Sequence, residues 1–247
     1  INVYLESVLT SGNNWKHSFT SRTTIVPNYG DIDNDGQYEI VVGTESGLYF
    51  FNPDGTQKTT GVPDLPNYNF RMPAVVEDMN SDGMDDLVVV GHDGSVGRMF
   101  GFISDGTQFE TVLPEAPDVA MYNSDLIFIY PHIFAKDIDS DGSDEIFYYS
   151  RPYCWIYDLD GNYIRMIPFP SGEPRHYVSA DIDGDGQDEL YASSRYLMQY
   201  DLQGNNSGSF DLQMDTGNHC ASRSLSAVDI DNDGKHELIA FTRFLED

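Results

Sequence analysis

The stretch DIDGDGQDEL at residues 181–190 decides the fold. Carboxylates stand at its first, third, fifth and ninth positions, and a glycine stands at its sixth. The same nine-residue pattern, D-x-D/N-x-D-G-x-x-D/E, occurs five times, with starts that lie 44 to 59 residues apart. A pattern that recurs at this period predicts an array of similar small structural units. The five copies start at Asp31, Asp78, Asp137, Asp181 and Asp229.

Strand-like segments surround each copy of the loop. After the first copy come the apolar residues 40–42, a second run at residues 48–51 and a turn at residues 52–55. Aromatic and β-branched runs bounded by Gly, Asn and Asp are typical of strands and turns, and no stretch favours a helix. Four short strands in about 45 residues is the size of one blade of a β-propeller.

The two ends of the chain complement each other. After the fifth loop there is room for one strand and a short tail, whereas residues 2–5 and 15–19 resemble the third and fourth strands of a unit. We therefore expect one all-β domain, a five-bladed β-propeller with four antiparallel strands per blade, whose ring is closed by N- and C-terminal strands in one blade. Closure removes exposed sheet edges; the alternative is a fragment of a larger ring. The expected blades cover about residues 21–66, 67–124, 125–170, 171–217, and 218–247 together with 1–20.

The acidic loops have the composition of calcium sites. Calcium takes six to eight oxygen ligands, and the loop offers side-chain oxygens at positions 1, 3, 5 and 9 and a backbone carbonyl at position 7. Glycine at position 6 permits the sharp turn. We predict about five calcium ions, one per blade. The predicted ligands are Asp31, Asp33, Asp35, Gln37 and Glu39; Asp78, Asn80, Asp82, Met84 and Asp86; Asp137, Asp139, Asp141, Ser143 and Glu145; Asp181, Asp183, Asp185, Gln187 and Glu189; and Asp229, Asp231, Asp233, Lys235 and Glu237.

Two other interpretations of the loops are weaker. An EF-hand needs a Glu at loop position 12 and flanking helices, but that position falls inside strand-like runs. Acidic surface turns without a cation would suffer strong repulsion between their carboxylates. The loops are therefore expected to be structural, and no catalytic role is assigned to them.

Composition limits the function further. The formal net charge is −28, which excludes bulk binding to nucleic acid phosphates and calls for cations; five divalent ions would reduce it to about −18. Cys154 and Cys220 are too few for a disulfide scaffold, and whether they pair is left open. No signal peptide is visible, so we expect a targeting segment to have been removed or to be absent from this chain. No apolar run approaches the roughly 20 residues of a membrane span.

The repeated loop resembles the calcium loops of FG-GAP (VCBS-type) propellers. Integrin α-chain heads, some lectins and several polysaccharide lyases, including rhamnogalacturonan lyases, carry similar loops. The resemblance covers all five copies and implies a calcium-binding propeller that is secreted or at the cell surface, but it says little about function. The Phe-Gly and Gly-Ala-Pro elements of the family are degraded here, and their nearest remnants are Val42-Gly43 and Val90-Gly91.

Basic residues gather at the expected face opposite the loops. Propeller strands alternate in direction, so that face holds the turns between second and third strands and the entries into first strands. Arginine suits carboxylate or sulfate groups because its fork donates two parallel hydrogen bonds. For the arginines that recur at equivalent positions, the alternative to ligand binding is a structural role in the scaffold. The predicted ligand-binding residues are Arg71, Arg151, Arg175, Arg195, His219, Arg223 and Arg243.

Three kinds of function remain open. The first is a carbohydrate-binding module of lectin or adhesion type, with acidic glycans as partners. The second is a polysaccharide lyase, in which arginines neutralise a uronate carboxylate and Tyr130, His132 or His176 removes the C5 proton. The third is a protein-binding structural propeller. The ligand's identity and the oligomeric state are left open.

Overall fold

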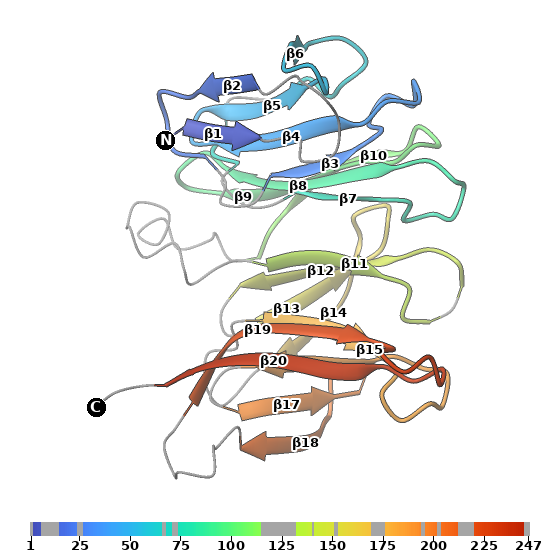
Figure 1. Ribbon diagram of the computed structural model, residues 1–247. Coiled ribbons are helices and arrows are strands. Elements are labelled where there is room, and N and C mark those ends of the chain that lie inside the picture. Colours follow the sequence, from blue (N-terminus) through green and yellow to red (C-terminus); the bar gives the residue numbers. More distant parts are fainter. Residues whose placement is uncertain are drawn as a thin grey trace.

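The computed structural model describes an all-β arrangement (Figure 1), and no helix occurs among the described residues. Strands β1 to β20 are all paired antiparallel. In the same part of the chain no helix is long and apolar enough to cross a membrane. The described residues are 2–5, 15–23, 27–65, 68–70, 74–114, 132–139, 141–150, 153–168, 176–193, 196–201, 204–211 and 220–244.

Sixteen of the strands form four sheets of four strands, in which strands that are consecutive in the chain are neighbours. Sheet 1 contains β3 (Asn28–Gly30), β4 (Glu39–Thr44), β5 (Gly47–Phe51) and β6 (Gln57–Lys58). Sheet 2 contains β7 (Val75–Glu77), β8 (Asp86–His92), β9 (Gly97–Phe102) and β10 (Gln108–Val112). Sheet 3 contains β11 (His132–Lys136), β12 (Glu145–Ser150), β13 (Tyr153–Tyr157) and β14 (Tyr163–Pro168). Sheet 4 contains β15 (His176–Ala180), β16 (Glu189–Ser193), β17 (Tyr196–Tyr200) and β18 (Asn206–Asp211).

The terminal strands form two separate pairs. β1 (Asn2–Leu5) pairs with β2 (Trp15–Ser18), and β19 (Cys220–Val228) pairs with β20 (Glu237–Phe244). Each pair matches the expected half of a blade. Among the described strands, however, the two pairs are not hydrogen-bonded into one four-stranded sheet.

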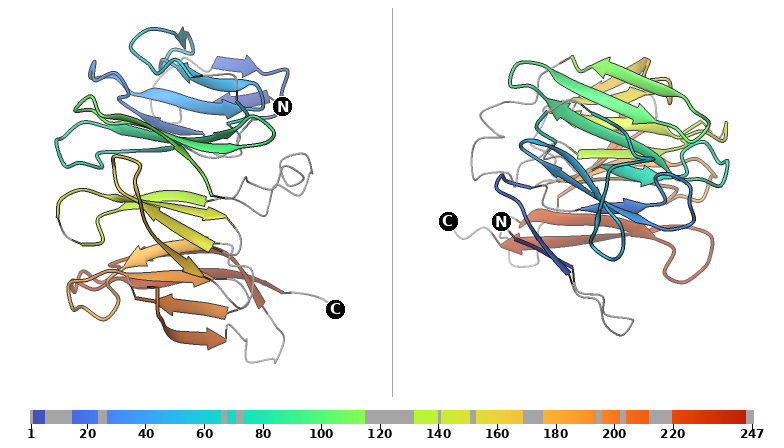
Figure 2. Two further views of the ribbon diagram at one scale, coloured as in Figure 1. Left: turned by 180° about the vertical axis from the view of Figure 1, so that it is seen from behind. Right: turned by 90° about the horizontal axis from the view of Figure 1, so that it is seen from above.

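The sheets follow one another through their first strands. β3 contacts β7, β7 contacts β11, β11 contacts β15, and β15 contacts β19. The acidic loops join the first and second strands of each sheet and therefore emerge on the same side, at the right of Figure 1. Figure 2 shows the same succession of sheets from behind and from above. This arrangement is consistent with a β-propeller.

Two-sided burial explains the continuous apolar runs in the sequence. In β12, Ile146 and Tyr148 pack in a cluster shared with sheet 2, whereas Phe147 and Tyr149 pack in a cluster shared with sheet 4. All four side chains are at most 1% exposed. A strand that is buried on both faces has no polar alternation, and each such side chain contributes about 1.5–3 kcal/mol by burial.

One outer contact recurs between neighbouring sheets. A side chain from the fourth strand of a sheet, or in one case from β2, lies against the glycine in the turn between the third and fourth strands of another sheet. At these glycines φ lies between 77° and 87°, and an added Cβ would come within 3.1 Å of the neighbouring side chain. The three pairs are Phe109 with Gly161, Ile167 with Gly204, and Trp15 with Gly55.

Candidate metal centres

The aspartate at position 1 organises each acidic loop. In loop 1 (residues 31–39) the Asp31 carboxylate accepts the backbone N–H groups of Asp35 at 2.9 Å and Gly36 at 2.8 Å. The same pair of bonds recurs in loop 2 (residues 78–86), loop 4 (residues 181–189) and loop 5 (residues 229–237). Loop 3 (residues 137–145) has the glycine bond at 3.0 Å.

The backbone conformation explains why position 6 of the loop is a glycine. Its φ lies between 85° and 93° in all five loops, a left-handed conformation that strains other residues. Positions 1 and 6 of the sequence pattern therefore shape the loop before any ion is considered.

The acid at position 9 ties the end of the loop to its beginning. Glu39 accepts the N–H of Ile32 at 3.1 Å, and Glu145 accepts the N–H of Ile138 at 3.0 Å. Equivalent bonds in loops 2 and 5 measure 2.8 Å and 2.9 Å. Each bond uses one carboxylate oxygen and leaves the second for other partners.

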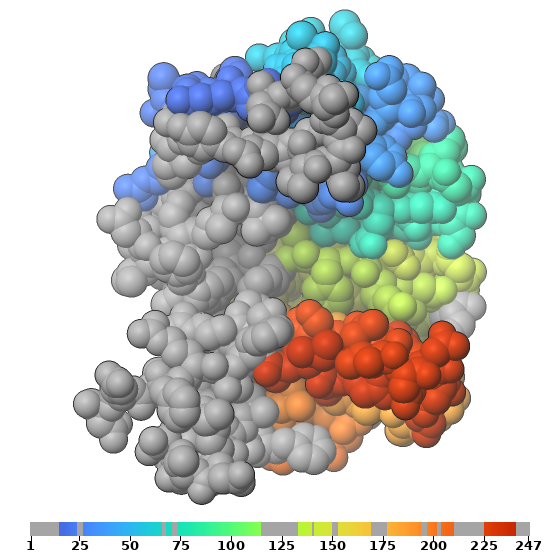
Figure 3. Space-filling model, in the orientation of Figure 1, coloured from blue at the N-terminus to red at the C-terminus, as the bar shows by residue number. Residues whose placement is uncertain are grey.

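Four of the loops bring three carboxylates together. One oxygen from each acid lies within 4.8 Å of the others, close enough for all three to contact one ion. The ends of the sheets that carry the acidic loops follow one another along one side of the molecule (Figure 3). The groups are Asp31, Asp33 and Glu39; Asp137, Asp139 and Glu145; Asp181, Asp183 and Asp185; and Asp229, Asp231 and Glu237.

Burial and charge crowding make the acids of loops 3 and 4 suitable for a hard cation. Burial raises the pKa of Glu145, and the neighbouring charges of Asp139, Asp137 and Asp141 raise it further. In loop 4 burial likewise raises the pKa of Glu189. A divalent ion offsets both effects because it favours the charged carboxylates, and a donor set made only of oxygens suits calcium.

Loop 2 differs from these groups because its acids have neutral partners. The hydroxyl of Ser104 donates to Asp82 at 2.8 Å, and the Asn80 amide donates to the same carboxylate at 3.1 Å. The backbone N–H of Ser104 donates to the fully buried Asp86 at 2.7 Å. Ser104 lies outside the nine-residue pattern, so no signal in that pattern points to it.

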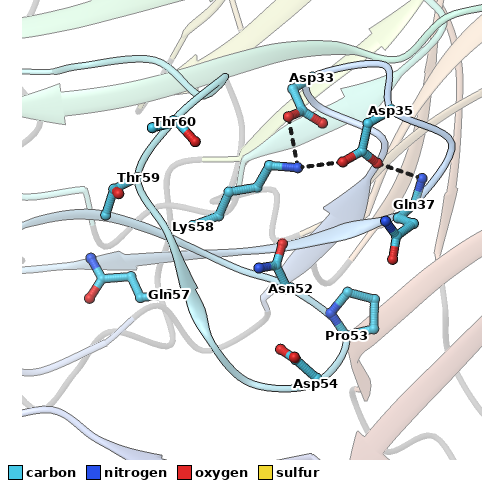
Figure 4. A pocket seen from close by; sticks show the side chains of 10 residues that line it. All are labelled: Asp33, Asp35, Gln37, Asn52, Pro53, Asp54, Gln57, Lys58, Thr59 and Thr60. Atoms are coloured by element: carbon cyan, nitrogen blue, oxygen red, sulfur yellow. Dashed lines mark hydrogen bonds and ion pairs between the residues drawn. The ribbon is translucent and has the colours of Figure 1, made fainter.

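Loop 1 differs because a lysine lies among its acids (Figure 4). The ammonium of Lys58, at the end of β6, is 2.7 Å from Asp33 Oδ2, 3.0 Å from Asp35 Oδ2 and 2.9 Å from Glu39 Oε1. Hydrogen bonding from Lys58 is the main cause that lowers the pKa of Asp35. These partners raise the pKa of Lys58 although burial opposes them. The second oxygen of Asp33 is buried and has no hydrogen-bond partner among the described residues.

The loops are also linked from sheet to sheet, mainly through position 8. Asp85 accepts the N–H of Asp31 at 2.8 Å, the N–H of Asp144 donates to the Met79 carbonyl at 2.7 Å, and the N–H of His236 donates to the Asp181 carbonyl at 3.0 Å. Lys235 was predicted to offer its carbonyl to an ion. Its side chain reaches the neighbouring loop and donates to the Asp183 carbonyl at 2.8 Å. Hydrogen bonds therefore connect these neighbouring loops directly.

Most of the residues predicted for the opposite face lie outside the described part of the chain. This applies to Tyr130, Arg71, Arg151, Arg175, Arg195 and His219. Four others have a described backbone only: His132 and His176 begin β11 and β15, Arg223 lies in β19 where the register shifts, and Arg243 lies near the end of β20. Arg22, which precedes β3, has a described side chain, and its Nε lies 3.8 Å from Glu45 Oε1.

The fold and the loops together define a propeller-type protein with acidic, oxygen-lined turns on one side. Residues 31–89 match the family described as FG-GAP-like repeat, which confirms the resemblance to FG-GAP-type propellers. No curated protein matches the sequence.

Solved structures with a similar fold have low sequence identity. BBS1N in complex with ARL6DN gives a TM-score of 0.57 at 15% identity, over 93% of this chain and 65% of that chain. The V. cholerae biofilm matrix protein Bap1 gives 0.55 at 17% identity, over 89% of this chain and 34% of that chain. The exotype rhamnogalacturonan lyase YesX gives a TM-score of 0.47 at 16% identity, over 83% of this chain and 46% of that chain. This chain spans less than two thirds of each, and the likeness concerns the fold alone.

Proposed function

We propose that this chain is a calcium-stabilised, carbohydrate-binding propeller that works outside the cell, either secreted or at the cell surface, and recognises acidic glycans on the face opposite the loops. The observation that carries the proposal is the placement of basic residues in a chain of net charge −28. His132 and His176 begin β11 and β15, and Arg223 and Arg243 lie in β19 and β20. All four lie toward the strand ends remote from the acidic loops. Because β11, β15 and β19 are successive neighbours, these residues share one end of three adjacent sheets.

Calcium is the second part of this proposal. The carboxylate groups in the loops offer oxygen ligands with the crowding that a divalent ion relieves. Millimolar calcium is available outside cells, and extracellular modules use sites with affinities in that range. The Bap1 relative is described as a biofilm matrix protein, a setting that fits such a role.

Ring closure by a fifth blade is the third part. Trp15 of β2 contacts Gly55 as Phe109 and Ile167 contact the equivalent glycines, which is the relation of a fourth strand to the next blade. On this basis β1 and β2 complete the blade begun by β19 and β20. In the described structure Ile230 is 63% exposed, whereas Met79 and Ile138 at the same loop position are 1% and 6% exposed. Closure against sheet 1, where Tyr38 is 58% exposed, covers this apolar surface.

A cross-link tests closure. In the double variant Tyr38→Cys with Ile230→Cys, a closed ring forms an intramolecular disulfide under mild oxidation, and each single variant does not. Disulfides that form only between molecules would contradict closure within one chain.

A polysaccharide lyase is the second candidate, because two histidines begin neighbouring first strands at the same end of the sheets. In that reaction His132, His176 or Tyr130 accepts the C5 proton, and the arginines of the same face bind the carboxylate. A screen of acidic polysaccharides with calcium present distinguishes the candidates. Binding without new ultraviolet absorbance supports the binding module, whereas absorbance from the conjugated double bond of the product supports the lyase. If neither binding nor absorbance is seen, both candidates are contradicted and a protein-binding propeller is left.

A further inference from the structure

Lys58 lies where an ion would lie in loop 1. Its ammonium contacts the acids at positions 3, 5 and 9, at 2.7, 3.0 and 2.9 Å respectively. An ammonium has three N–H donors, so these contacts satisfy all of them. The Lys58 side chain is 10% exposed and that of Glu39 is 0% exposed.

The lysine and a calcium ion exclude each other. Calcium binds carboxylate oxygens at about 2.3–2.6 Å, and the ammonium nitrogen is already within hydrogen-bond distance of the same three carboxylates. Both cations therefore require the same space and the same oxygens. Calcium can enter loop 1 only if Lys58 withdraws from it.

The segment after Lys58 packs against the loop that the lysine enters. Gly61 lies against Asp33, since a Cβ added there would come within 2.5 Å of Asp33 Oδ2. The φ of Gly61 is 74°, which favours glycine. Lys58 itself is fixed by the pairing of β6 with β5. Strand β6 thus places Lys58 at loop 1, and the chain that follows packs against Asp33 of the same loop.

Counted from the glycine of each turn, the corresponding positions of the other sheets carry no cation, although a register shift in sheet 3 places Arg165 opposite Ile156 much as Lys58 lies opposite Phe50. Three residues after the glycine of each turn, the sequence has Lys58 in sheet 1 but Phe109, Ile164 and Ser207 in sheets 2 to 4. Two described lysines lie beside loops 3 to 5: Lys136 is 3.3 Å from Asp188, which is not a predicted ligand, and Lys235 donates to a backbone carbonyl. In the part of the chain that the structure describes, loop 1 is the loop whose acids at positions 3, 5 and 9 are all within ion-pair distance of one lysine.

We propose that Lys58 is the resident cation of loop 1, so that this loop is held by a tethered ammonium and does not take up calcium in the wild-type protein. The inference rests on the proposed role of calcium in the other loops. It changes the expected number of ions, because loop 1 contributes none. A tethered cation is not lost on dilution or chelation, so loop 1 keeps its shape when calcium is removed.

Counting bound calcium by native mass spectrometry tests the proposal. Lys58→Ala binds one ion more than the wild type at saturating calcium, because the three acids that Lys58 contacts become available beside Asp31. Lys58→Arg, which keeps the cation, and Lys136→Ala, which removes a lysine 3.3 Å from an acid outside the predicted ligands, keep the wild-type count. Equal counts for the wild type and Lys58→Ala overturn the inference. A wild type that binds no calcium overturns the proposed calcium role itself, which is a separate result.

Amine labelling of the wild type gives a second test that needs no variant. Lys58 stays protected from an acylating reagent with and without calcium, while Lys136, 46% exposed, is labelled in both. Labelling of Lys58 that increases when calcium is added would show displacement by the ion and contradict the proposal.

Discussion

Loops 1 and 3 have the same backbone design and opposite electrostatics. In both, the acid at position 9 bonds to the N–H at position 2, and the glycine at position 6 is left-handed. In loop 1 the acids surround Lys58. In loop 3 they crowd one another, and burial with neighbouring charges raises the pKa of Glu145. The repeated pattern therefore determines the shape of the loop, while in our proposal a residue outside the pattern determines which cation holds it.

Glu145→Gln is expected to have the largest effect. Glutamine keeps an acceptor for the Ile138 N–H but removes the charge that binds an ion. At calcium one hundredfold above its dissociation constant, the free energy of unfolding should fall by about 3 kcal/mol. In chelator the loss should nearly disappear. Denaturant titrations under both conditions measure it, and an equal loss in both would contradict a calcium site in loop 3.

Glu39→Gln probes the same position in loop 1 and should behave differently. Glu39 is fully buried, and its partners are the Lys58 ammonium and the Ile32 N–H. Weakening this buried pair should cost about 2 kcal/mol, because Lys58 keeps Asp33 and Asp35. The same titrations should give this loss with and without calcium. A loss confined to calcium-containing buffer would place an ion, and not the lysine, in loop 1.

Ser104→Ala tests the neutral partners in loop 2. It removes the hydroxyl that donates to Asp82 at 2.8 Å and leaves the backbone bond to Asp86. The expected loss of stability is about 1 kcal/mol, measured by chemical denaturation. If calcium satisfies Asp82 in place of Ser104, the loss is smaller in calcium than in chelator; the reverse order would contradict an ion in loop 2.

Lys136→Gln is the smallest change and calibrates the others. Lys136 is half-exposed and lies 3.3 Å from Asp188 Oδ2, which the pattern does not assign to an ion. A surface pair of this kind contributes below about 0.5 kcal/mol. A loss as large as that of Glu39→Gln would mean that lysine–acid pairs matter here whether or not they lie in a loop.

Short-range patterns made much of the fold predictable. The loop positions follow from backbone rules that act within nine residues, such as the Asp31 bonds to Asp35 and Gly36. The strands follow from apolar runs such as Ile146–Tyr149, which are buried on both faces. The resemblance to FG-GAP-type propellers was also recognisable from these loops.

Contacts between distant segments were not predictable in the same way. Lys58 reaches Asp35 from 23 residues away, and Ser104 reaches Asp82 from 22 residues away. Neither recurs from blade to blade, so periodicity gave no signal for them. The link from Lys235 to Asp183 spans 52 residues and depends on how two sheets pack. The repeated sequence pattern thus located the candidate ion sites, but it gave no sign that Lys58 lies among the acids of loop 1.

Thermal unfolding of the wild type in calcium and in chelator tests the central claim most directly. If calcium holds the crowded loops, the melting temperature rises with calcium concentration by about 10 °C or more near saturation. An identical melting temperature in calcium and in chelator would contradict the account, because the acidic loops would then be held without a divalent ion.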